Sequence, residues 1–545
     1  SVKARRPARS IDSAAEQLEM RTLLAAFTVT SVADTIDANP GNGFAADVSG
    51  TTTLRAAIQE SNALPGSDVI ILPSGTYTLG RAGAGEDNAF SGDLDVTGGQ
   101  LTILGAGSDR TFIDGNDLDR VLHIFAGATV TISGVTIQNG TALNGGGILN
   151  AGTLFLRDSV VTANAAIGAS GIGGGIGVSG GQLNLSNVTV SSNTADVSGG
   201  GLFSAGGLVT VVDSTFSANV AGVDGGGIAT VGGELDVTSS TISGNSTTLD
   251  GGGISVQNAS VNLSEVTVTG NVAGDDGGGV NLIANAVGVI DNSTLSNNSA
   301  TDFGGGIRNF GASLNIFDST ISANQAGESG GGLDNDTAFT EVVNSLFLSN
   351  VASVDGGGIN NYVGVLNFGN STVTANQSGD YGGGINNGLN GTATIVNATI
   401  SGNTAVGRGG GIRSRGITNL ANTIVSGNLG IRSGRDAFGN FTTLGNNLIG
   451  EVVSANGLIN GVSSDQVGSE AEPIDALLGP LQDNGGSTLS MALTIGSPAI
   501  DAGISNGAAR VDQIGNDRLQ DGDLDNTPVV DIGAVEFTNT TPHFT

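Results

Sequence analysis

Acidic side chains that recur from repeat to repeat are the first residues of this chain that could do chemistry. They flank successive glycine triplets and could stack along one face of a repeating fold: Asp224, Asp250, Asp275, Asp276, Asp302, Glu328, Asp355 and Asp380. A glycosidase needs two carboxylates facing one sugar bond, about 5 to 9.5 Å apart. Because these acids recur with the repeat, whereas a catalytic pair should break it at one place, the pattern favours a structural row.

Basic residues and histidines give little support for catalysis. A polysaccharide lyase needs a strong base, usually Lys or Arg, beside calcium-bound acids. Arg413 and Arg415 lie on one expected short strand, where they could bind a sugar acid or could be edge residues near a cap. His123 and His543 are too isolated along the chain to indicate a metal site or a catalytic triad. We therefore predict no catalytic residues. The only basic residues of the array after Gly173 are Arg308, Arg408, Arg413 and Arg415.

A short acidic motif near the C-terminus, DGDLDNTPVVD, is the best candidate for metal binding. It places Asp521, Asp523 and Asp525 at alternate positions, the spacing of loops that wrap carboxylates around calcium. The sixth position holds Asn526 in place of glycine, and the twelfth holds Ile532 in place of glutamate, so the motif is not an EF-hand. It predicts either a calcium site or an acidic solvated loop, and calcium is the one cofactor that we expect.

Glycine triplets reveal the elements that must position these residues. Their spacing is 26 to 28 residues along the whole array. A fixed period of this length is typical of a solenoid, in which each repeat contacts only its neighbours. The triplets begin at Gly145, Gly173, Gly199, Gly225, Gly251, Gly277, Gly304, Gly330, Gly356, Gly382 and Gly409.

Asparagines recur with the same period. Stacked amides can hydrogen-bond along a solenoid axis and satisfy backbone groups at a turn, so we predict a structural asparagine ladder. Its members precede the triplets by six positions: Asn193, Asn219, Asn245, Asn271, Asn298, Asn324, Asn350, Asn376 and Asn403. A second polar column lies six residues before the asparagines: Asp158, Asn187, Asp213, Asn292, Asp318, Asn344, Asn370 and Asn397.

One repeat, GGGISVQNASVNLSEVTVTGNVAGDD (residues 251–276), contains three short alternating runs. Runs this short, broken by Gly, Asn and Asp, indicate strands and not helices. The residue after each triplet is aliphatic, and an apolar residue stands three positions before each ladder asparagine, which predicts two core columns. The fold expected is all-β, a right-handed single-stranded parallel β-helix of the pectate-lyase type with about 26 residues per coil.

Four regions follow from changes in composition and period. Residues 1–26 form a basic leader with five basic side chains, and residues 27–80 an N-terminal cap. The cap should contain a short helix in TTLRAAIQESNALPG with Leu54, Ala57 and Ile58 on one face, followed by a strand in DVIILPSGTYTL. Residues 81–430 carry the β-helix, and residues 431–545 a C-terminal cap. Caps are expected because the ends of a solenoid leave strand edges and core open.

Composition excludes several classes of partner. The formal charge is −32, with 93 glycines, a single lysine (Lys3) and no cysteine. Such acidity excludes a nucleic-acid partner, whose phosphates need a basic surface, and disfavours anionic membranes. Without cysteine there is no disulfide or thiolate chemistry. No run of about 18 apolar residues predicts a membrane-spanning segment.

Several stretches resemble known families. FSAN, ISGN and FLSN together with GGGI are similar to the repeats of chlamydial polymorphic outer membrane proteins and of pectate-lyase-like β-helices, over roughly residues 120–430. TTTLRAAIQESNALPGSDVIILPSGTYTL resembles the CSLREA-type N-terminal domain, with Thr52 where members carry cysteine. LEMRTLL resembles the LEPR-XLL segment of planctomycete exported proteins, with Met20 in place of proline. GPLQDNGGSTLSMALTIGSPAIDAG through VDIGAVEF resembles the choice-of-anchor Q domain.

These resemblances imply an exported bacterial cell-surface protein. We expect a non-enzymatic rigid spacer, fibre component or adhesin; the alternative is a polysaccharide lyase or glycoside hydrolase on the same scaffold. Expected partners are cell-surface glycans or other copies of the chain, because a basic leader facing an acidic body could dock head to tail and form a fibre.

Overall fold

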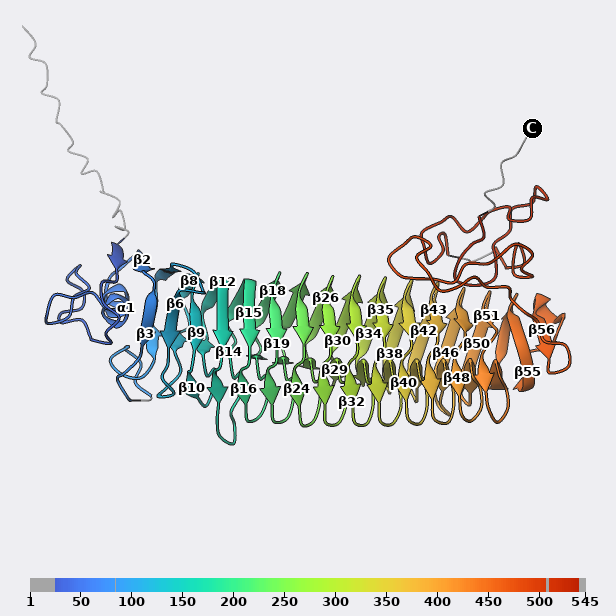
Figure 1. Ribbon diagram of the computed structural model, residues 1–545, viewed down its shortest axis with the longest axis horizontal. Coiled ribbons are helices and arrows are strands. Elements are labelled where there is room, and N and C mark those ends of the chain that lie inside the picture. Colours follow the sequence, from blue (N-terminus) through green and yellow to red (C-terminus); the bar gives the residue numbers. More distant parts are fainter. Residues whose placement is uncertain (1–24, 84, 506–508, 539–545) are drawn as a thin grey trace, which may run out of the picture.

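The chain forms one long rod in the computed structural model, which describes residues 25–83, 85–505 and 509–538 (Figure 1). The predicted basic leader, residues 1–26, lies almost wholly outside the described residues. The rod is a stack of about 14 turns, each of about 26 residues, and has almost no helix. The predicted all-β parallel β-helix is therefore confirmed.

Each coil contributes four strands, as the coil that starts at Gly251 shows: β25 (Ile254–Gln257), β26 (Ser260–Ser264), β27 (Thr267–Thr269) and β28 (Val272–Ala273). The first three coincide with the three predicted alternating runs. The fourth was not predicted, because a strand of two residues is too short to show alternation. Its buried residue is Ala273, so its inward side is small and carries no strong apolar signal.

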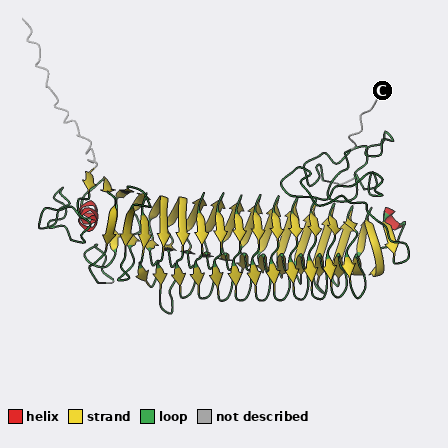
Figure 2. Ribbon diagram, in the orientation of Figure 1, coloured by secondary structure: helices red, strands yellow, loops and turns green. Residues whose placement is uncertain are grey.

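Equivalent strands of successive coils pair in parallel and build four columns. Figure 2 shows the strands of successive coils as ranks of arrows along the rod. The column that follows the triplets consists of β4 (Leu94–Val96), β7 (Leu122–Ile124), β11 (Ile148–Asn150), β14 (Ile176–Ser179), β17 (Leu202–Ala205), β21 (Ile228–Val231), β25, β29 (Val280–Ile283), β33 (Ile307–Phe310), β37 (Leu333–Asp336), β41 (Ile359–Asn361), β45 (Ile385–Asn387), β49 (Ile412–Ser414) and β53 (Ala437–Asn440). The next column consists of β1 (Ala25–Thr28), β2 (Ser67–Leu72), β5 (Gln100–Gly105), β8 (Thr129–Ser133), β12 (Thr153–Thr162), β15 (Gln182–Ser191), β18 (Leu208–Val212), β22 (Glu234–Thr238), β26, β30 (Val287–Asp291), β34 (Ser313–Phe317), β38 (Phe339–Val343), β42 (Val365–Gly369), β46 (Thr392–Val396), β50 (Ile417–Ala421) and β54 (Thr442–Gly445).

The other two columns complete the coil. The third, to which β12 and β15 also contribute, contains β3 (Gly75–Thr78), β6 (Thr111–Asp114), β9 (Thr136–Gln138), β19 (Thr215–Ser217), β23 (Thr241–Ser243), β27, β31 (Thr294–Ser296), β35 (Thr320–Ser322), β39 (Leu346–Leu348), β43 (Thr372–Thr374), β47 (Thr399–Ser401), β51 (Ile424–Val425), β55 (Leu448–Asn456) and β56 (Gln466–Ser469). The fourth is a separate sheet of two-residue strands: β10 (Thr141–Ala142), β13 (Ala165–Ala166), β16 (Thr194–Ala195), β20 (Val220–Ala221), β24 (Ser246–Thr247), β28, β32 (Ser299–Ala300), β36 (Gln325–Ala326), β40 (Val351–Ala352), β44 (Gln377–Ser378), β48 (Thr404–Ala405) and β52 (Leu429–Gly430).

The hydrophobic core runs along the axis and contains both predicted core columns. Ile254, directly after a triplet, pairs in register with Val280 of the next coil, and both are buried. Ile242 and Phe347, each three positions before a ladder asparagine, are fully buried. Each coil therefore stacks its apolar side chains on those of its neighbours, as expected for a solenoid.

The predicted helix is present as α1 (Leu54–Ala63) at the N-terminal end of the rod. Thr53 caps it by accepting a hydrogen bond from the Ala56 amide at 3.2 Å. Leu54, Ala57 and Ile58 are buried in the main core cluster, and the helix contacts β2 and β4. The helix therefore shields apolar core at the first coil.

After β53 the chain first ends the stack and then turns back. Leu458 and Val467 are buried at the end of the main core, next to β55 and β56 and the short 3-10 helix η1 (Val462–Ser464). Residues 470–538 then run back along one side of the rod, as the red segment in Figure 1 shows. They attach to the second polar column: the Asn370 amide donates to the Val511 carbonyl at 2.9 Å.

Among the described residues, no helix has the length and apolar character needed to cross a bilayer.

Candidate functional site

The glycine triplets fold the chain sharply back on itself. The first glycine of each triplet has a positive φ, between 61° and 72°, a region that glycine adopts without the penalty other residues meet. A Cβ on Gly304 would lie 2.4 Å from the Ile307 carbonyl oxygen and 2.7 Å from the Arg308 amide nitrogen. The other two glycines leave room for neighbouring backbone: a Cβ on Gly252 would lie 2.6 Å from the Gly278 carbonyl oxygen.

This fold brings two columns of side chains face to face across a concave corner, which we call the corner groove. Its rim is the residue before each triplet: Asn144, Ile172, Ser198, Asp224, Asp250, Asp276, Phe303, Ser329, Asp355, Tyr381 and Arg408. Its floor is the second residue of the strand that follows each triplet: Leu149, Gly177, Phe203, Ala229, Ser255, Asn281, Arg308, Asp334, Asn360, Asn386 and Arg413. A rim residue contacts the floor residue of its own or of the next coil, as Phe303 and Asp276 both do with Arg308.

The floor changes character along the rod. It is apolar or small from Leu149 to Ala229 and polar from Ser255 onward, although its side chains stay buried: Asn281 and Asp334 are each 1% exposed. A sequence position that repeats for structural reasons should keep its type, as the triplets do. This change makes the second half of the groove the candidate for a specific function.

Hydrogen bonds join this polar floor into one chain across five coils. The side-chain amide of Asn360 donates to the Asp334 carboxylate at 2.6 Å, and that of Asn386 donates to the side-chain oxygen of Asn360 at 2.7 Å. The Arg413 guanidinium donates to the side-chain oxygen of Asn386 at 2.9 Å. At the other end, the Arg308 guanidinium is paired with Asp334. This row of hydrogen-bonded side chains therefore begins and ends with an arginine.

Aromatic rings flank both arginines. The guanidinium carbon of Arg308 lies 4.8 Å from the centroid of the Phe303 ring and 5.3 Å from that of Phe310. The guanidinium carbon of Arg413 lies 4.4 Å from the centroid of Tyr381. Such contacts hold a guanidinium flat and leave its hydrogen-bonding edge available.

A cavity of about 330 Å³ opens in the middle of the groove. Asp336 and Tyr362 line it on the outer side of the floor, and Tyr362 is 57% exposed. Its lining is mixed, with aromatic, carboxylate, amide, hydroxyl and guanidinium groups: Phe303, Arg308, Ser329, Asp334, Asp336, Asp355, Asn360 and Tyr362.

Several acids of the rim are partly buried, and burial raises their pKa values. Burial raises the pKa of Asp276 to about 6, although the neighbouring Arg308 guanidinium opposes the rise. Burial also raises the pKa of Asp355 and of Asp250. A carboxyl with a raised pKa keeps its proton to a higher pH than usual and can then donate a hydrogen bond or a proton to a ligand. On the floor, both side-chain amide atoms of Asn281 are buried and have no hydrogen-bond partner among the described residues.

The predicted ladder asparagines lie inside the rod, between the third and fourth strand columns. All nine are at most 1% exposed. Each amide donates to the side-chain carbonyl of the next asparagine at 2.9 to 3.0 Å: Asn193, Asn219, Asn245, Asn271, Asn298, Asn324, Asn350, Asn376 and Asn403. The row continues beyond them to Asn164 and Asn428, and it ends where Asn428 donates to the carboxylate of Asp436.

The acidic motif of the C-terminal segment gathers only in part. Ligand atoms of Asp521 and Asp523 lie within 4.8 Å of each other and of Asp501, which comes from an earlier loop. Asp525 is not part of this group; its backbone amide donates to the carboxylates of Asp521 and Asp523 at 3.0 Å each. Asp501 was not a predicted ligand, because it lies twenty positions before Asp521.

Sequence reasoning missed the corner groove. We predicted no site that breaks the period, because the triplets, the ladder and the flanking acids all recur. The groove could have been found from the position four residues after the first glycine of each triplet. There the residue type changes from Ala229 and Ser255 to Asn281 and Arg308. The groove places Arg413 on its floor with Arg415 beside it, whereas Arg415 itself is exposed.

No protein-family model matches the sequence, and no curated protein matches it. Three solved structures of glycan-active β-helix enzymes share the general architecture. The catalytic domain of a GH87 alpha-1,3-glucanase in complex with nigerose is 12% identical, with a TM-score of 0.33, covering 72% of this chain and 69% of that one. A pectate lyase is 13% identical, with a TM-score of 0.25 and coverage of 95% and 98%. A PL6 family alginate lyase is 11% identical, with a TM-score of 0.31 and coverage of 85% and 57%.

Proposed function

We propose that this chain is a non-enzymatic protein of the bacterial cell surface that binds an extended acidic glycan along its corner groove, as a rod-shaped adhesin or spacer. The observation that carries the proposal is the polar floor from Arg308 to Arg413, which is flanked by aromatic rings and joined by an ion pair and hydrogen bonds. Planar polar groups with adjoining aromatic faces recognise sugars, whose rings present both hydroxyls and apolar C–H surfaces.

A polymer fits this surface better than a small ligand. Equivalent groups repeat at about 4.8 Å per coil, so successive sugars could meet successive coils. The cavity near Tyr362 is open and has no deep apolar pocket that would enclose a compact molecule.

Arginines at the C-terminal end of the groove favour an acidic glycan. Five arginines fall between residues 408 and 435 of an otherwise acidic chain: Arg408, Arg413, Arg415, Arg432 and Arg435. Among the described residues, Arg408 and Arg415 make no ion pair, and both are exposed. Guanidinium groups form bidentate hydrogen bonds with carboxylates. Uronic acids could therefore bind at this end of the groove.

Binding to acidic and neutral polysaccharides of matched length tests the proposal. We expect Tyr381→Ala and Arg413→Gln each to lower affinity for an acidic polymer at least tenfold, because each removes a contact group of the groove. Phe339→Ala is the matched control: Phe339 is exposed on β38, outside the cavity lining. Absence of binding to any polysaccharide, or equal losses in Tyr381→Ala and Phe339→Ala, would overturn the proposal.

A second candidate function is hydrolysis or elimination of the same glycan. The observation that favours it is Asp276, whose pKa is raised to about 6 and which lies 3.5 Å from the Arg308 guanidinium. A carboxyl of this kind could protonate a leaving group. Polymer cleavage by the native chain that disappears in Asp276→Asn, with binding retained, would replace the non-enzymatic proposal.

Calcium binding by the C-terminal segment is a separate part of the proposal. The expected ligands are Asp521, Asp523 and, from its position, Asp501. Calcium should raise the melting temperature of the native chain and not that of Asp523→Asn. Asp525→Asn is the matched control, because its carboxylate lies outside the group; equal calcium responses in all three proteins would place no calcium here.

A further inference from the structure

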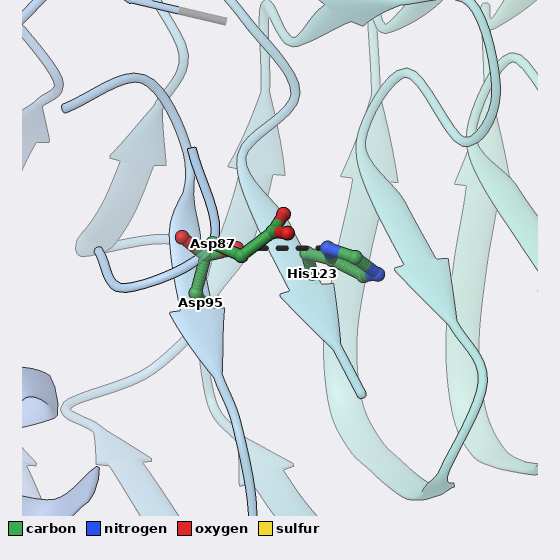
Figure 3. Close-up of side chains that lie close together, drawn as sticks. All are labelled: Asp87, Asp95 and His123. Atoms are coloured by element: carbon green, nitrogen blue, oxygen red, sulfur yellow. Dashed lines mark ion pairs between the residues drawn. The ribbon is translucent and has the colours of Figure 1, made fainter. Parts of the chain in front are cut away.

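The floor of the corner groove has a second polar stretch at its N-terminal end. Asp95 on β4 pairs in register with His123 on β7, and His123 pairs with Leu149, the first floor residue of the triplet array. Asp87, from the loop before β4, reaches the same place (Figure 3). Ligand atoms of the three side chains all lie within 4.8 Å of one another.

Asp95 has a buried carboxyl group with one oxygen that accepts no hydrogen bond among the described residues. The residue is fully buried; one carboxylate oxygen accepts a hydrogen bond from the Ala89 amide at 2.7 Å, and the other accepts none among the described residues. Its ion pair, at 3.5 Å, is with the Nδ1 atom of His123. A buried carboxylate is costly unless a cation or several hydrogen bonds compensate it.

Two arginines at this end of the rod form ion pairs with other acids. Arg55 forms an ion pair with Asp34, and Arg120 forms one with Asp93. The Asp95 oxygen without a hydrogen bond lies 3.5 Å from the Nδ1 atom of His123, so a cation bound between the two side chains would give that oxygen a partner.

We propose that Asp87, Asp95 and His123 bind a divalent first-row transition metal such as zinc. Imidazole nitrogen and carboxylate oxygen are both zinc ligands at about 2.0 to 2.2 Å. In a tetrahedral shell such ligand atoms stand about 3.4 Å apart, so small side-chain rotations would close the site. The imidazole disfavours calcium and magnesium, which take oxygen ligands.

Three protein ligands leave one position open. Asp87 and the ring of His123 lie toward solvent, with Asp87 exposed and the His123 side chain 16% exposed. A hydroxyl or carboxylate of a bound molecule could reach the open position from the solvent and complete the shell. The metal site itself does not depend on the identity of that molecule.

Zinc titration of the untagged, chelator-treated full chain by calorimetry tests the site, with calcium titrated in parallel. We expect one zinc per chain, at least 100-fold weaker binding in His123→Asn, and at least tenfold weaker binding in Asp87→Asn. Asp109→Asn, an exposed acid of the neighbouring turn, should bind zinc like the native chain. Melting curves of each variant check folding, and Asp87 is exposed enough to be replaced without disturbing the core.

Cobalt offers a readout that does not rely on affinity. Cobalt bound by one imidazole and two carboxylates should give visible absorption bands that zinc abolishes by displacement and that His123→Asn lacks. Zinc bound equally by the native chain and His123→Asn would be an adventitious ion only and would overturn the proposal. So would the absence of stoichiometric zinc binding, or calcium binding as tight as that of zinc.

Discussion

A methyl group should have very different effects at two neighbouring glycines, Gly252 and Gly244. A Cβ on Gly252 would lie 2.5 Å from the backbone carbon of Val272, and neither backbone can yield without moving a coil. Gly244 has a φ of 61°, nothing lies within 4 Å of an added Cβ, and Ala218 holds the equivalent place one coil earlier with a φ of 54°.

We therefore expect Gly252→Ala to lower the free energy of unfolding by about 3 kcal/mol. Gly244→Ala should lower it by about 1 kcal/mol or less. Chemical denaturation of the two variants measures the difference. Equal losses would contradict the steric role of the second glycine of the triplet.

The side-chain amide of Asn245 takes part in several hydrogen bonds of the ladder and should therefore contribute to stability. It donates to the Phe216 carbonyl and to Asn271, and its oxygen accepts from the backbone and side-chain amides of Asn219, all at 2.9 to 3.0 Å. Asn245→Ala leaves buried groups unpaired, so we expect a loss of at least about 2 kcal/mol. Asn262→Ala, at an exposed position of β26, is the control and should be nearly neutral. A neutral Asn245→Ala would contradict the energetic role of the ladder.

At the scale of the element, the sequence predicts those features that recur in every coil. Strand columns and core follow from the period, because Ile242 and its equivalents must all be apolar to stack. The corner groove does not follow, because the residue type of its floor changes along the rod and its side chains come together only when the coils are in register. His123 is isolated along the chain for the same reason: Asp95 lies 28 positions before it and becomes its neighbour through strand pairing.

The end of the ladder should make stability depend on pH. Asp436 accepts hydrogen bonds from the backbone and side chain of Asn428, and burial raises its pKa from 3.8 to about 6. The folded chain therefore binds this proton more tightly than the unfolded chain does. Stability from this group is greatest below about pH 4, falls as pH rises to about 6, and is constant above; the change corresponds to about 3 kcal/mol.

Asp436→Asn removes that titration and keeps an oxygen for Asn428. Unfolding at pH 4 and at pH 7.5 should show a larger loss of stability in the native chain than in the variant, by up to about 3 kcal/mol. Other buried acids titrate equally in both proteins and cancel in the comparison. The same pH dependence in native chain and variant would show that Asp436 does not carry it.

At the scale of the whole molecule, a buried arginine links the returning C-terminal segment to the rod and forms an ion pair inside the segment. Arg518 donates to Glu536 at 2.6 Å and to the Asn370 side chain at 3.0 Å, and the Arg518 and Glu536 side chains are each 1% exposed. Burial raises the pKa of Glu536 to about 8, with the charge of Asp531 adding to the rise and Arg518 opposing it. Removal of the arginine would leave a buried carboxyl without its partner.

We expect Arg518→Met to release the segment without unfolding the coils. Limited proteolysis should then cut between residues 470 and 538 at least tenfold faster, while the far-ultraviolet circular dichroism of the rod stays unchanged. Arg510→Met is the matched control from the same segment, because Arg510 is exposed and its ion pair with Asp517 is loose at 3.8 Å. Simultaneous loss of the dichroism signal in Arg518→Met would mean that segment and coils unfold as one unit.

Assembly of whole rods can use two surfaces that differ in their response to salt. The basic leader, residues 1–26, could dock on the acidic body of a neighbour, and such contacts weaken as the screening length falls from about 30 Å at 0.01 M salt to about 8 Å at 0.15 M. The other surface is the C-terminal end of the stack, where apolar side chains are 46% to 59% exposed: Leu444, Val453, Ile459 and Val462. Contacts between apolar surfaces do not weaken with salt.

Strand pairing between rods is disfavoured because both ends are obstructed. Helix α1 packs on the first coil, and the last strand, β56, has four residues and uses the Val467 amide to bond the Asn460 side chain. We therefore expect single rods at 0.15 M salt, and head-to-tail association at 0.01 M salt only when residues 1–26 are present. Sedimentation of the full chain and of a version lacking residues 1–26, each at both salt concentrations, measures this. Association that persists without the leader and grows with salt would instead place the contact at the apolar end, where Ile459→Ser should abolish it.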